Sequence, residues 1–535
     1  MGWASWDTGK LDFADGRYVV AIRYSAAPNA DGFGARASDL HEHPLLDSLA
    51  LGAASAPDKV LVVSEESSMT YGEAHLLTRA LIRFLSSEIG LAHSDTIIVY
   101  LANRLEVPSI VVAADALGLR VVMRPPYALG ECIADNAILA PSLIFVADVD
   151  ARAVLETNGI SIPIVTLEES DDSNLSLHSI LEAFADEKGA LPGFAPSEVV
   201  LFSSGSTGLP KGIVNPMSSF LHNALELASA LGINAGDVLY APVPVFHVYG
   251  FVSMTVALLH GATWAILERY STDRSLELIE KERPTVFFCV PTMLIREMKR
   301  DETVPHRIDS LRVCMVAGDG CPRSALEKYE RRYGCSVVLS YGMTETAATL
   351  TVENPSASSE LRHSSVGHVI SGVELTIDSA TGEILVRTPS LMSSLINYET
   401  GEERAINRTD WFMTGDIGRI DDCGRLHVLG RMKSVIVRGG LNIFPSQVER
   451  VYREHPCIED CAVAGYPDAE LGECICLIAV CPKGGGVSLE ELREWAKDKL
   501  ERGMLPEKLV VLDELPCLSN GKRDVERLRA IARDN

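Results

Sequence analysis

The sequence predicts an α/β fold in which a large N-terminal domain with several subdomains is followed by a small, mobile α+β domain. Apolar β-branched runs alternate with amphipathic helical stretches over most of the chain, which is typical of largely parallel sheets. The length of 535 residues corresponds to about three to four folding units. Near Gly430 the pattern changes, and the remaining stretch of about a hundred residues has the size of one small domain.

Individual elements follow from the apolar patterns and from the turn residues between them. We expect strands over 96–104 (with a turn), 120–126, 198–202, 311–317, 336–340 and 473–480, and helices over 109–118 and 322–334. The segments 311–317, 322–334 and 336–340 form one right-handed βαβ unit. Its loops should lie at the C-terminal edge of the sheet. The acidic, then Gly/Pro-rich stretch 168–196 predicts a surface connection between two sub-lobes. Residues 1–40 carry no usable pattern.

Composition excludes several classes of partner. The net charge of −25 argues against wrapping nucleic acid or docking on an anionic membrane, so any polyanion must be held locally. The N-terminus lacks the pattern of a signal peptide, and the apolar stretch 248–267 is interrupted by Gly and His. The twelve cysteines show no zinc-ligand spacing and indicate a reducing compartment. We therefore expect a soluble, cytoplasmic protein.

The strongest local signal is a loop suited to phosphate. A strand over 198–202 leads into a Ser/Thr/Gly-rich loop that ends in a lysine; its candidate ligands are Ser203, Ser204, Gly205, Ser206, Thr207, Gly208 and Lys211. Glycines let several backbone N–H groups converge, and the lysine adds a positive charge. The alternative is an ordinary Ser/Gly-rich surface turn. A Walker A loop and a hydrolase nucleophile elbow both fail on spacing.

The segment SSGSTGLPKG resembles the signature loop of the adenylate-forming superfamily, which includes acyl- and aryl-CoA ligases, adenylation domains and beetle luciferases. Further motifs of that superfamily follow: AGDG at 317–320, YGMTET at 341–346, WFMTGD at 411–416, GRMK at 430–433 and LPCLSNGK at 515–522. The resemblance spans about residue 40 to the end, with the major motifs in order. The pattern is closest to that of acid–CoA ligases.

The resemblance assigns roles to the nucleotide-binding residues. Tyr341, Gly342, Met343 and Thr344 would contact adenine and the α-phosphate, Gly318, Asp319 and Gly320 would border adenine, and Asp416 and Arg431 would hold the ribose. Glu345 would bind Mg²⁺. Lys522 would bring the acid carboxylate to the α-phosphate. Lys433 would be the pivot of a hinge at about 431–433, between domains of residues 1–430 and 434–535. The catalytic set is Lys522, Glu345, Thr344 and His247.

The resemblance also indicates a site for the acid and one for a thiol. The acid wall would consist of Phe246, His247, Val248, Val316, Ala317, Gly342, Met343, Ala347 and Ala348. It contains no Asp for an α-amino group, which favours an aromatic or medium-sized apolar acid. Taken alone, His247 has the alternative of a satisfied core histidine. Arg438, Gly439 and Gly440 would lie beside the pantetheine arm of CoA.

The implied reaction has two halves. A carboxylic acid attacks Mg·ATP to give an acyl-adenylate and pyrophosphate, and CoA then displaces AMP. Alternatives are the loading of an acyl or aryl group onto a carrier protein, a luciferase-like oxygenase, and a non-catalytic nucleotide-binding protein. Two departures from the superfamily stand out: Met217 in place of a His, and Gly503-Met504 in place of a Tyr-Lys pair. The second weakens the CoA assignment slightly.

Overall fold

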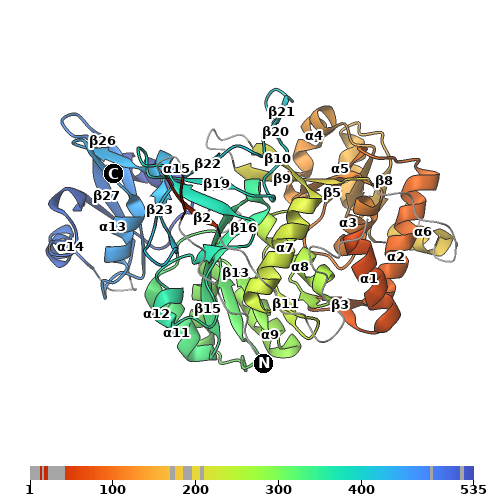
Figure 1. Ribbon diagram of the computed structural model, residues 1–535, viewed down its shortest axis with the longest axis horizontal. Coiled ribbons are helices and arrows are strands. Elements are labelled where there is room, and N and C mark those ends of the chain that lie inside the picture. The colour runs from red at the N-terminus through yellow and green to blue at the C-terminus, as the bar shows by residue number, and fades with distance from the viewer. Residues whose placement is uncertain are drawn as a thin grey trace.

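The protein consists of a larger part with three β-sheets and a smaller C-terminal part with a fourth. The computed structural model describes residues 12–14, 17–21, 43–168, 175–184, 195–204, 210–481, 486–517 and 523–534 (Figure 1). The smaller part, blue in Figure 1, lies at one end of the elongated molecule. The predicted α/β class, with a large N-terminal and a small C-terminal domain, is confirmed.

The sheet that carries the predicted phosphate loop has eight strands. In spatial order they are β21 (Glu403–Ala405), β20 (Ser394–Asn397), β10 (Pro210–Pro216), β9 (Glu198–Ser204), β6 (Arg120–Arg124), β5 (Thr96–Tyr100), β7 (Leu143–Val146) and β8 (Ile164–Thr166). The strands from β9 to β8 run parallel, whereas β10, β20 and β21 are antiparallel additions. β9 and β10 therefore form a β-hairpin, and the phosphate loop joins them.

A second sheet has nine strands. In spatial order they are β17 (His368–Val369), β16 (Ala348–Val352), β15 (Ser336–Met343), β14 (Val313–Val316), β13 (Val286–Cys289), β11 (Val238–Tyr240), β12 (Thr263–Ala265), β3 (Val60–Val63) and β4 (Ser68–Thr70). Its strands are parallel from β15 to β3. β14 and β15 are neighbours joined by α11 (Arg323–Tyr333), which confirms the predicted strand–helix–strand unit. β15 continues three residues beyond the predicted end.

The third sheet differs from the largely parallel arrangement that the sequence predicts. Its six strands are β1 (Asp12–Ala14), β2 (Arg17–Ala21), β18 (Glu374–Ile377), β19 (Glu383–Arg387), β22 (Phe412–Ile420) and β23 (Leu426–Arg431), and all neighbours are antiparallel. The segments 378–382 and 421–425 are too short for a parallel crossover, which needs a dozen or more residues. Tight turns centred on Asp378 and Asp421 connect these strands instead.

The C-terminal part has its own sheet and its own core. Its strands are β25 (Leu441–Ile443), β24 (Ile436–Arg438), β27 (Gly472–Val480), β26 (Asp460–Asp468) and β28 (Lys508–Leu512). On one face α13 (Pro445–Tyr452) and α14 (Leu489–Ala496) cover one apolar cluster, and on the other α15 (Val525–Asp534) covers a second. Cys474 and Cys476 are buried in β27, as the sequence predicts. A separate core is what an independent domain requires.

The stretch 168–196 does not join two sub-lobes, because the strands on either side of it, β8 and β9, belong to the same sheet. Its central portion is a helix, α6 (Leu177–Phe184), that packs against α2 (Tyr71–Arg83). The acidic and Gly/Pro-rich composition indicated a connection correctly. It gave no information about which strands the connection joins.

The interrupted apolar stretch 248–267 folds as α8 (Val248–His260) followed by β12. α8 is buried against α7 (Met217–Leu231) and α1 (Pro44–Ser55). Other helices are α3 (Val107–Ala116), α4 (Cys132–Leu139), α5 (Val149–Thr157), α9 (Thr272–Glu282), α10 (Pro291–Asp301) and α12 (Ser359–Arg362). Among the described residues, no helix combines the length and the apolar character that crossing a bilayer requires.

Candidate active site

The base of the phosphate hairpin is placed by the pairing of its strands. Ser203 on β9 lies opposite Lys211 on β10, and Lys211 also lies opposite Asn397 on β20. Lys211 is half-buried and lies next to the loop that joins the two strands. Ser204 ends β9, and the predicted ligands Gly205, Ser206, Thr207 and Gly208 lie outside the described residues. The strand that the sequence predicts before the loop is confirmed, and the roles of these residues stay predictions.

The second motif forms a strained turn at the end of β15. β15 continues into the short helix η4 (Thr344–Thr346), and the chain returns directly as β16. A Cβ on Gly342 would lie only 1.5 Å from the carbonyl oxygen of Ala348, so glycine is required there. Ala347 and Ala348 both have positive φ, 51° and 99°, which is rare for residues other than glycine. Strain of this kind often marks a functional segment.

The turn that holds Thr344 and Glu345 lies against the phosphate hairpin. The side-chain amide of Asn215, on β10, donates to the carbonyl oxygen of Thr344 at 3.1 Å, and η4 contacts both β9 and β10. The backbone N–H of Met392 donates to the carbonyl oxygen of Glu345 at 2.8 Å. Two motifs that are more than a hundred residues apart in sequence are thus held side by side. Sequence analysis missed Asn215, although a lone Asn in an apolar strand was a usable signal.

The predicted nucleoside-binding residues are in direct contact. The Tyr341 hydroxyl donates to Asp416 Oδ2 at 2.8 Å, and Arg431 Nε lies 3.2 Å from Asp416 Oδ1. Asp416 on β22 and Arg431 on β23 are register partners. Asp416 is 5% exposed, whereas the side chain of Arg431 is 71% exposed. Burial, followed by the Asp416 carboxylate, raises the pKa of the Tyr341 hydroxyl far above its ordinary value, so the hydroxyl stays a donor.

The predicted adenine-bordering loop is an exposed turn after β14. Gly318 has a φ of +91°, and the Gly320 N–H donates to Asp319 Oδ1 at 2.7 Å. Asp319 lies within electrostatic range of Arg453 and Cys517 in the C-terminal domain. The backbone of Cys517 pairs with that of Arg523 in an isolated antiparallel β-bridge. These two residues flank the segment that contains Lys522, which lies outside the described residues. This side of the C-terminal domain therefore faces the adenine loop.

The predicted acid-binding segment is built around the start of α8. His247 precedes the helix, and its ring lies 4.8 Å from that of Phe246, centroid to centroid. A Cβ on Gly250 would lie 2.2 Å from the carbonyl oxygen of Pro244, so glycine is required where the helix folds back on the segment. Val248, Ala317 and Met343 are half-buried and Gly342 is exposed, whereas Val316 and Ala347 are fully buried in the core. The acid wall stays a prediction.

Two further residues support this segment, and sequence analysis missed both. The buried Asn103 side chain accepts from the Val245 N–H at 2.7 Å and donates to the carbonyl oxygen of Val243 at 3.2 Å. The ring of Tyr127 packs edge-on against Phe246 at 6.2 Å. Asn103 follows a strand and Tyr127 follows a Pro pair, but neither pattern identifies a partner more than a hundred residues away.

The predicted thiol-binding residues form a tight hairpin in the C-terminal domain. Gly439 and Gly440 connect β24 to β25, and both have positive φ, 56° and 86°, so the turn itself requires glycines. Arg438 donates to Glu507 at 2.6 Å. A Cβ on Gly503 would lie 2.7 Å from Leu441 in the same hairpin. Two positions that sequence analysis linked to CoA, the glycine pair and Gly503, therefore lie together.

The predicted pivot Lys433 is exposed in the short helix η5 (Met432–Ser434), where β23 gives way to the C-terminal sheet. Its carbonyl oxygen accepts from Arg529 at 2.6 Å. Its position between the two cores agrees with a hinge.

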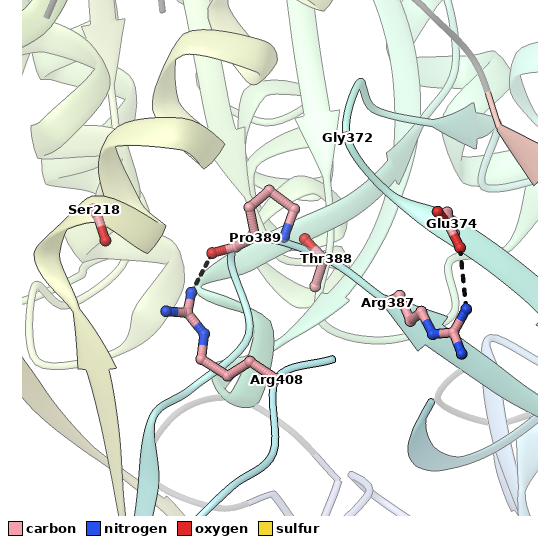
Figure 2. A pocket seen from close by; sticks show the side chains of 7 residues that line it. All are labelled: Ser218, Gly372, Glu374, Arg387, Thr388, Pro389 and Arg408. Atoms are coloured by element: carbon pink, nitrogen blue, oxygen red, sulfur yellow. Dashed lines mark hydrogen bonds and ion pairs between the residues drawn. The ribbon is translucent and has the colours of Figure 1, made fainter. Parts of the chain in front are cut away.

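A separate hollow contains none of the predicted site residues. Figure 2 shows it, with a lining of Ser218, Gly372, Glu374, Arg387, Thr388, Pro389 and Arg408. Its two arginines are directed away from each other, Arg408 to the carbonyl of Pro389 and Arg387 to Glu374 at 3.6 Å. They do not converge on one position, and we assign no substrate to this hollow.

Comparison with known proteins identifies the family. Residues 49–395 match the AMP-binding enzyme family, and residues 447–522 match the AMP-binding enzyme C-terminal domain. Since the first match covers well over half of the chain, the protein belongs to the AMP-binding enzymes. The adenylate-forming superfamily predicted from the loop motifs is confirmed.

Among curated relatives, the chain is 26% identical to 2-succinylbenzoate–CoA ligase of Bacillus subtilis, over 87% of this chain and 94% of the relative. It is 29% identical to indoleacetate–CoA ligase of Aromatoleum aromaticum, with the same coverage of both chains. Among solved structures, it resembles o-succinylbenzoate CoA synthetase of Bacillus subtilis in complex with ATP and magnesium. That match has 26% identity and a TM-score of 0.75, and covers 90% of this chain and 99% of the other.

Proposed function

We propose that this protein is an AMP-forming acid–CoA ligase. It activates a carboxylic acid with Mg·ATP to give an acyl-adenylate and pyrophosphate, and then transfers the acyl group to the thiol of CoA with release of AMP. One arrangement carries the proposal. Tyr341 on β15 contacts Asp416, which also pairs with Arg431. The same strand leads to Thr344 and Glu345, which lie against the phosphate hairpin. The relatives' names and their complexes with ATP and magnesium agree with the predicted ligase class, cofactor and substrates.

Each group in the site matches one part of ATP. The two oxygens of the Asp416 carboxylate suit the two ribose hydroxyls, and Tyr341 and Arg431 hold that carboxylate in place. The end of the hairpin that carries Ser203 and Lys211 would bind the phosphates. Positioning of this kind supplies most of the catalysis in phosphoryl and nucleotidyl transfer.

Glu345 is the residue that would hold magnesium. It is a half-buried carboxylate whose backbone is fixed by Met392, and hard oxygen ligands suit this ion. Within the described ranges, no group of three or more His, Cys, Asp or Glu side chains is arranged to hold a metal. That agrees with an ion bound by one carboxylate together with substrate phosphates. When bound, magnesium would neutralise phosphate charge.

Lys522 addresses the main electrostatic problem of the first half-reaction. A carboxylate and an α-phosphate are both negative, and their repulsion is strong in a partly desolvated site. A lysine on a separate domain can neutralise it and then withdraw. The bracketing residues Cys517 and Arg523 lie on the side of the C-terminal domain that faces Asp319, which supports this role.

We also propose the domain limits 1–430 and 434–535 with a hinge at about 431–433. Rotation about Lys433 would replace the Lys522 side of the C-terminal domain with the side that carries Arg438, Gly439 and Gly440. The exposed position of η5 between two separate cores supports this movement. A cytoplasmic location stays a prediction, supported by the twelve cysteines, all of which are free.

For the acid we propose an aromatic carboxylic acid. Phe246, Tyr127 and His247 supply aromatic surface at the predicted acid site. The named relatives act on succinylbenzoate and indoleacetate, both aromatic. Loading of an aryl group onto a carrier protein is the second candidate, because Gly503 and Met504 replace the Tyr-Lys pair and the glycine pair has a conformational reason of its own.

A screen of carboxylic acids for pyrophosphate release, with and without CoA, tests these proposals. We expect pyrophosphate release with one or more aromatic acids. We also expect turnover to AMP when CoA is the only thiol acceptor, without a carrier protein. Acid-dependent pyrophosphate exchange without any thioester product on CoA would favour the carrier-protein alternative. The absence of ATP binding by folded protein would contradict both.

A further inference from the structure

A buried arginine lies beneath the base of the phosphate hairpin. Arg124 ends β6, the strand next to β9, and is only 3% exposed. Its guanidinium carbon lies 4.3 Å from the centre of the Phe202 ring and 5.6 Å from that of Tyr398. A cation over an aromatic face is attracted by the ring, and more strongly when both groups are desolvated.

The two rings lie on either side of β10, one on β9 and one just after β20. Phe202 lies on β9, directly before Ser203, and Tyr398 directly follows β20, whose last residue, Asn397, lies opposite Lys211. The rings also contact each other edge-to-face, with centroids 5.1 Å apart. Arg124 therefore contacts aromatic rings on both sides of β10, next to Ser203 and Lys211.

Acidic groups hold the arginine in this position. Arg124 Nε donates to Asp135 Oδ2 at 2.8 Å, and Nη2 pairs with Glu131. Asp135 is fully buried and also accepts from the Tyr100 hydroxyl. Two carboxylates and two rings contact the guanidinium, and removing one partner from a buried network of this kind is costly.

We infer that Arg124 is a positioning residue that fixes the phosphate-binding hairpin for ATP. The inference rests on the proposed function, because it assumes that the hairpin binds the phosphates. Because Arg124 is buried beneath the strands, the role we assign to it needs no contact with the nucleotide. It acts through Phe202 and Tyr398, which set the position of Ser203 and Lys211.

The same strand offers a matched control. Arg120 starts β6 and also pairs with two carboxylates, Glu198 at 2.7 Å and Glu403 at 2.9 Å. It lies at the opposite end of the strand from the loop. Loss of Arg120 therefore removes a comparable ion-pair network without removing the aromatic contacts at the hairpin.

The experiment compares ATP and adenosine binding by calorimetry for wild type, Arg124→Met, Phe202→Leu and Arg120→Met. Adenosine lacks phosphates and, under the proposed function, would use only the Tyr341–Asp416 part of the site. We expect Arg124→Met and Phe202→Leu to weaken ATP binding about tenfold or more while leaving adenosine binding unchanged. Arg120→Met should leave both unchanged. Phe202→Leu keeps every ion pair, so it tests the idea even if Arg124→Met does not fold.

The outcomes separate this inference from the proposed function. Equal loss of ATP and adenosine affinity, unchanged ATP affinity, or an equal effect of Arg120→Met would overturn the positioning role alone. Failure of the folded wild type to bind ATP would overturn the proposed function and the inference together.

Discussion

At the scale of single residues, Asp416 shows how a carboxylate is prepared for a ligand. Each of its two oxygens already has a partner, the Tyr341 hydroxyl on one side and the Arg431 guanidinium on the other. These partners fix the plane of the carboxylate without a ligand, as the proposed ribose contact would require. An oriented, nearly buried acceptor pair reduces the cost of ordering on binding. Tyr341 thus has a second role besides the adenine contact that the sequence predicts.

Lys522 is predicted to serve only the first half-reaction. Lys522→Ala should suppress adenylate formation by a factor on the order of a hundred or more, because it removes the positive charge proposed to lie between the acid carboxylate and the α-phosphate. Thioester formation from supplied acyl-adenylate should be retained. Pyrophosphate exchange and single-turnover thioester assays measure the two steps. Equal loss in both would contradict a lysine that withdraws after the first step.

Glu297 makes a residue-scale prediction about stability. It is fully buried on α10, accepts a hydrogen bond from Ser275 at 2.5 Å, and burial raises its pKa from 4.5 to about 8. The folded protein therefore holds a proton that the unfolded chain has lost between about pH 4.5 and 8. By linkage, stability should fall as pH rises through this window.

Glu297→Gln should remove that dependence and raise the unfolding temperature at pH 8 by a few degrees relative to wild type. Thermal unfolding from pH 5 to 9 measures it. Glu302→Gln, at an exposed position after the same helix, is the control and should follow wild type. Parallel pH profiles for wild type and Glu297→Gln would show that Glu297 is ionised in the folded protein.

At the scale of elements, the site depends on a strand that reverses with almost no loop. β15 passes through η4 into β16, and the turn is held by Asn215 from β10 and by Asn223 from α7. The Asn223 side chain bonds both the N–H and the carbonyl oxygen of Thr349. A strand of another sheet and a helix thereby hold the turn that contains Thr344 and Glu345.

Gly342 tests this arrangement. Gly342→Ala would place a Cβ against the Ala348 carbonyl oxygen, so we expect the turn to shift and adenylation to fall by a factor on the order of a hundred. Gly486→Ala is the matched control, because its Cβ would meet nothing within 4 Å and Gly486 lies outside the predicted site. Pyrophosphate exchange measures both variants. Similar activities for the two would show that the close approach at Gly342 is not needed for catalysis.

At the scale of the whole molecule, two separate cores are joined by a short exposed segment. Polar contacts link them: Lys299 pairs with Glu459 at 2.5 Å, and Asp319 lies within electrostatic range of Arg453 and Cys517. Interfaces of this kind allow relative domain motion. The side of the C-terminal domain that carries the Gly439–Gly440 turn would have to replace the present one for thiol transfer.

Lys433→Pro should restrict the rotation of the C-terminal domain, because proline fixes the backbone angle φ at the proposed pivot. We expect pyrophosphate exchange to be retained and overall thioester production to fall by a factor on the order of ten or more. A coupled AMP assay beside the exchange assay measures the difference. Normal overall turnover would show that Lys433 is not the pivot.

The sequence by itself determined the family, the order of the motifs and several of the parallel strands. These features are local: a glycine-rich loop, a buried β-branched run and a helix start each depend on neighbouring residues. The β14–α11–β15 unit and the buried strand β27 were predictable for this reason. The antiparallel third sheet was missed, although its short turns at 378–382 and 421–425 were visible in the sequence.

Only the tertiary structure decided which distant residues meet. The contacts of Asn215 with Thr344, of Asn103 with Val245, and of Arg124 with Phe202 and Tyr398 join segments far apart in the chain. A polar side chain within an apolar strand indicates that a buried partner exists, because an unpaired polar group is costly. It does not say where that partner lies, since side-chain pairing across sheets depends on the folded packing of the whole domain.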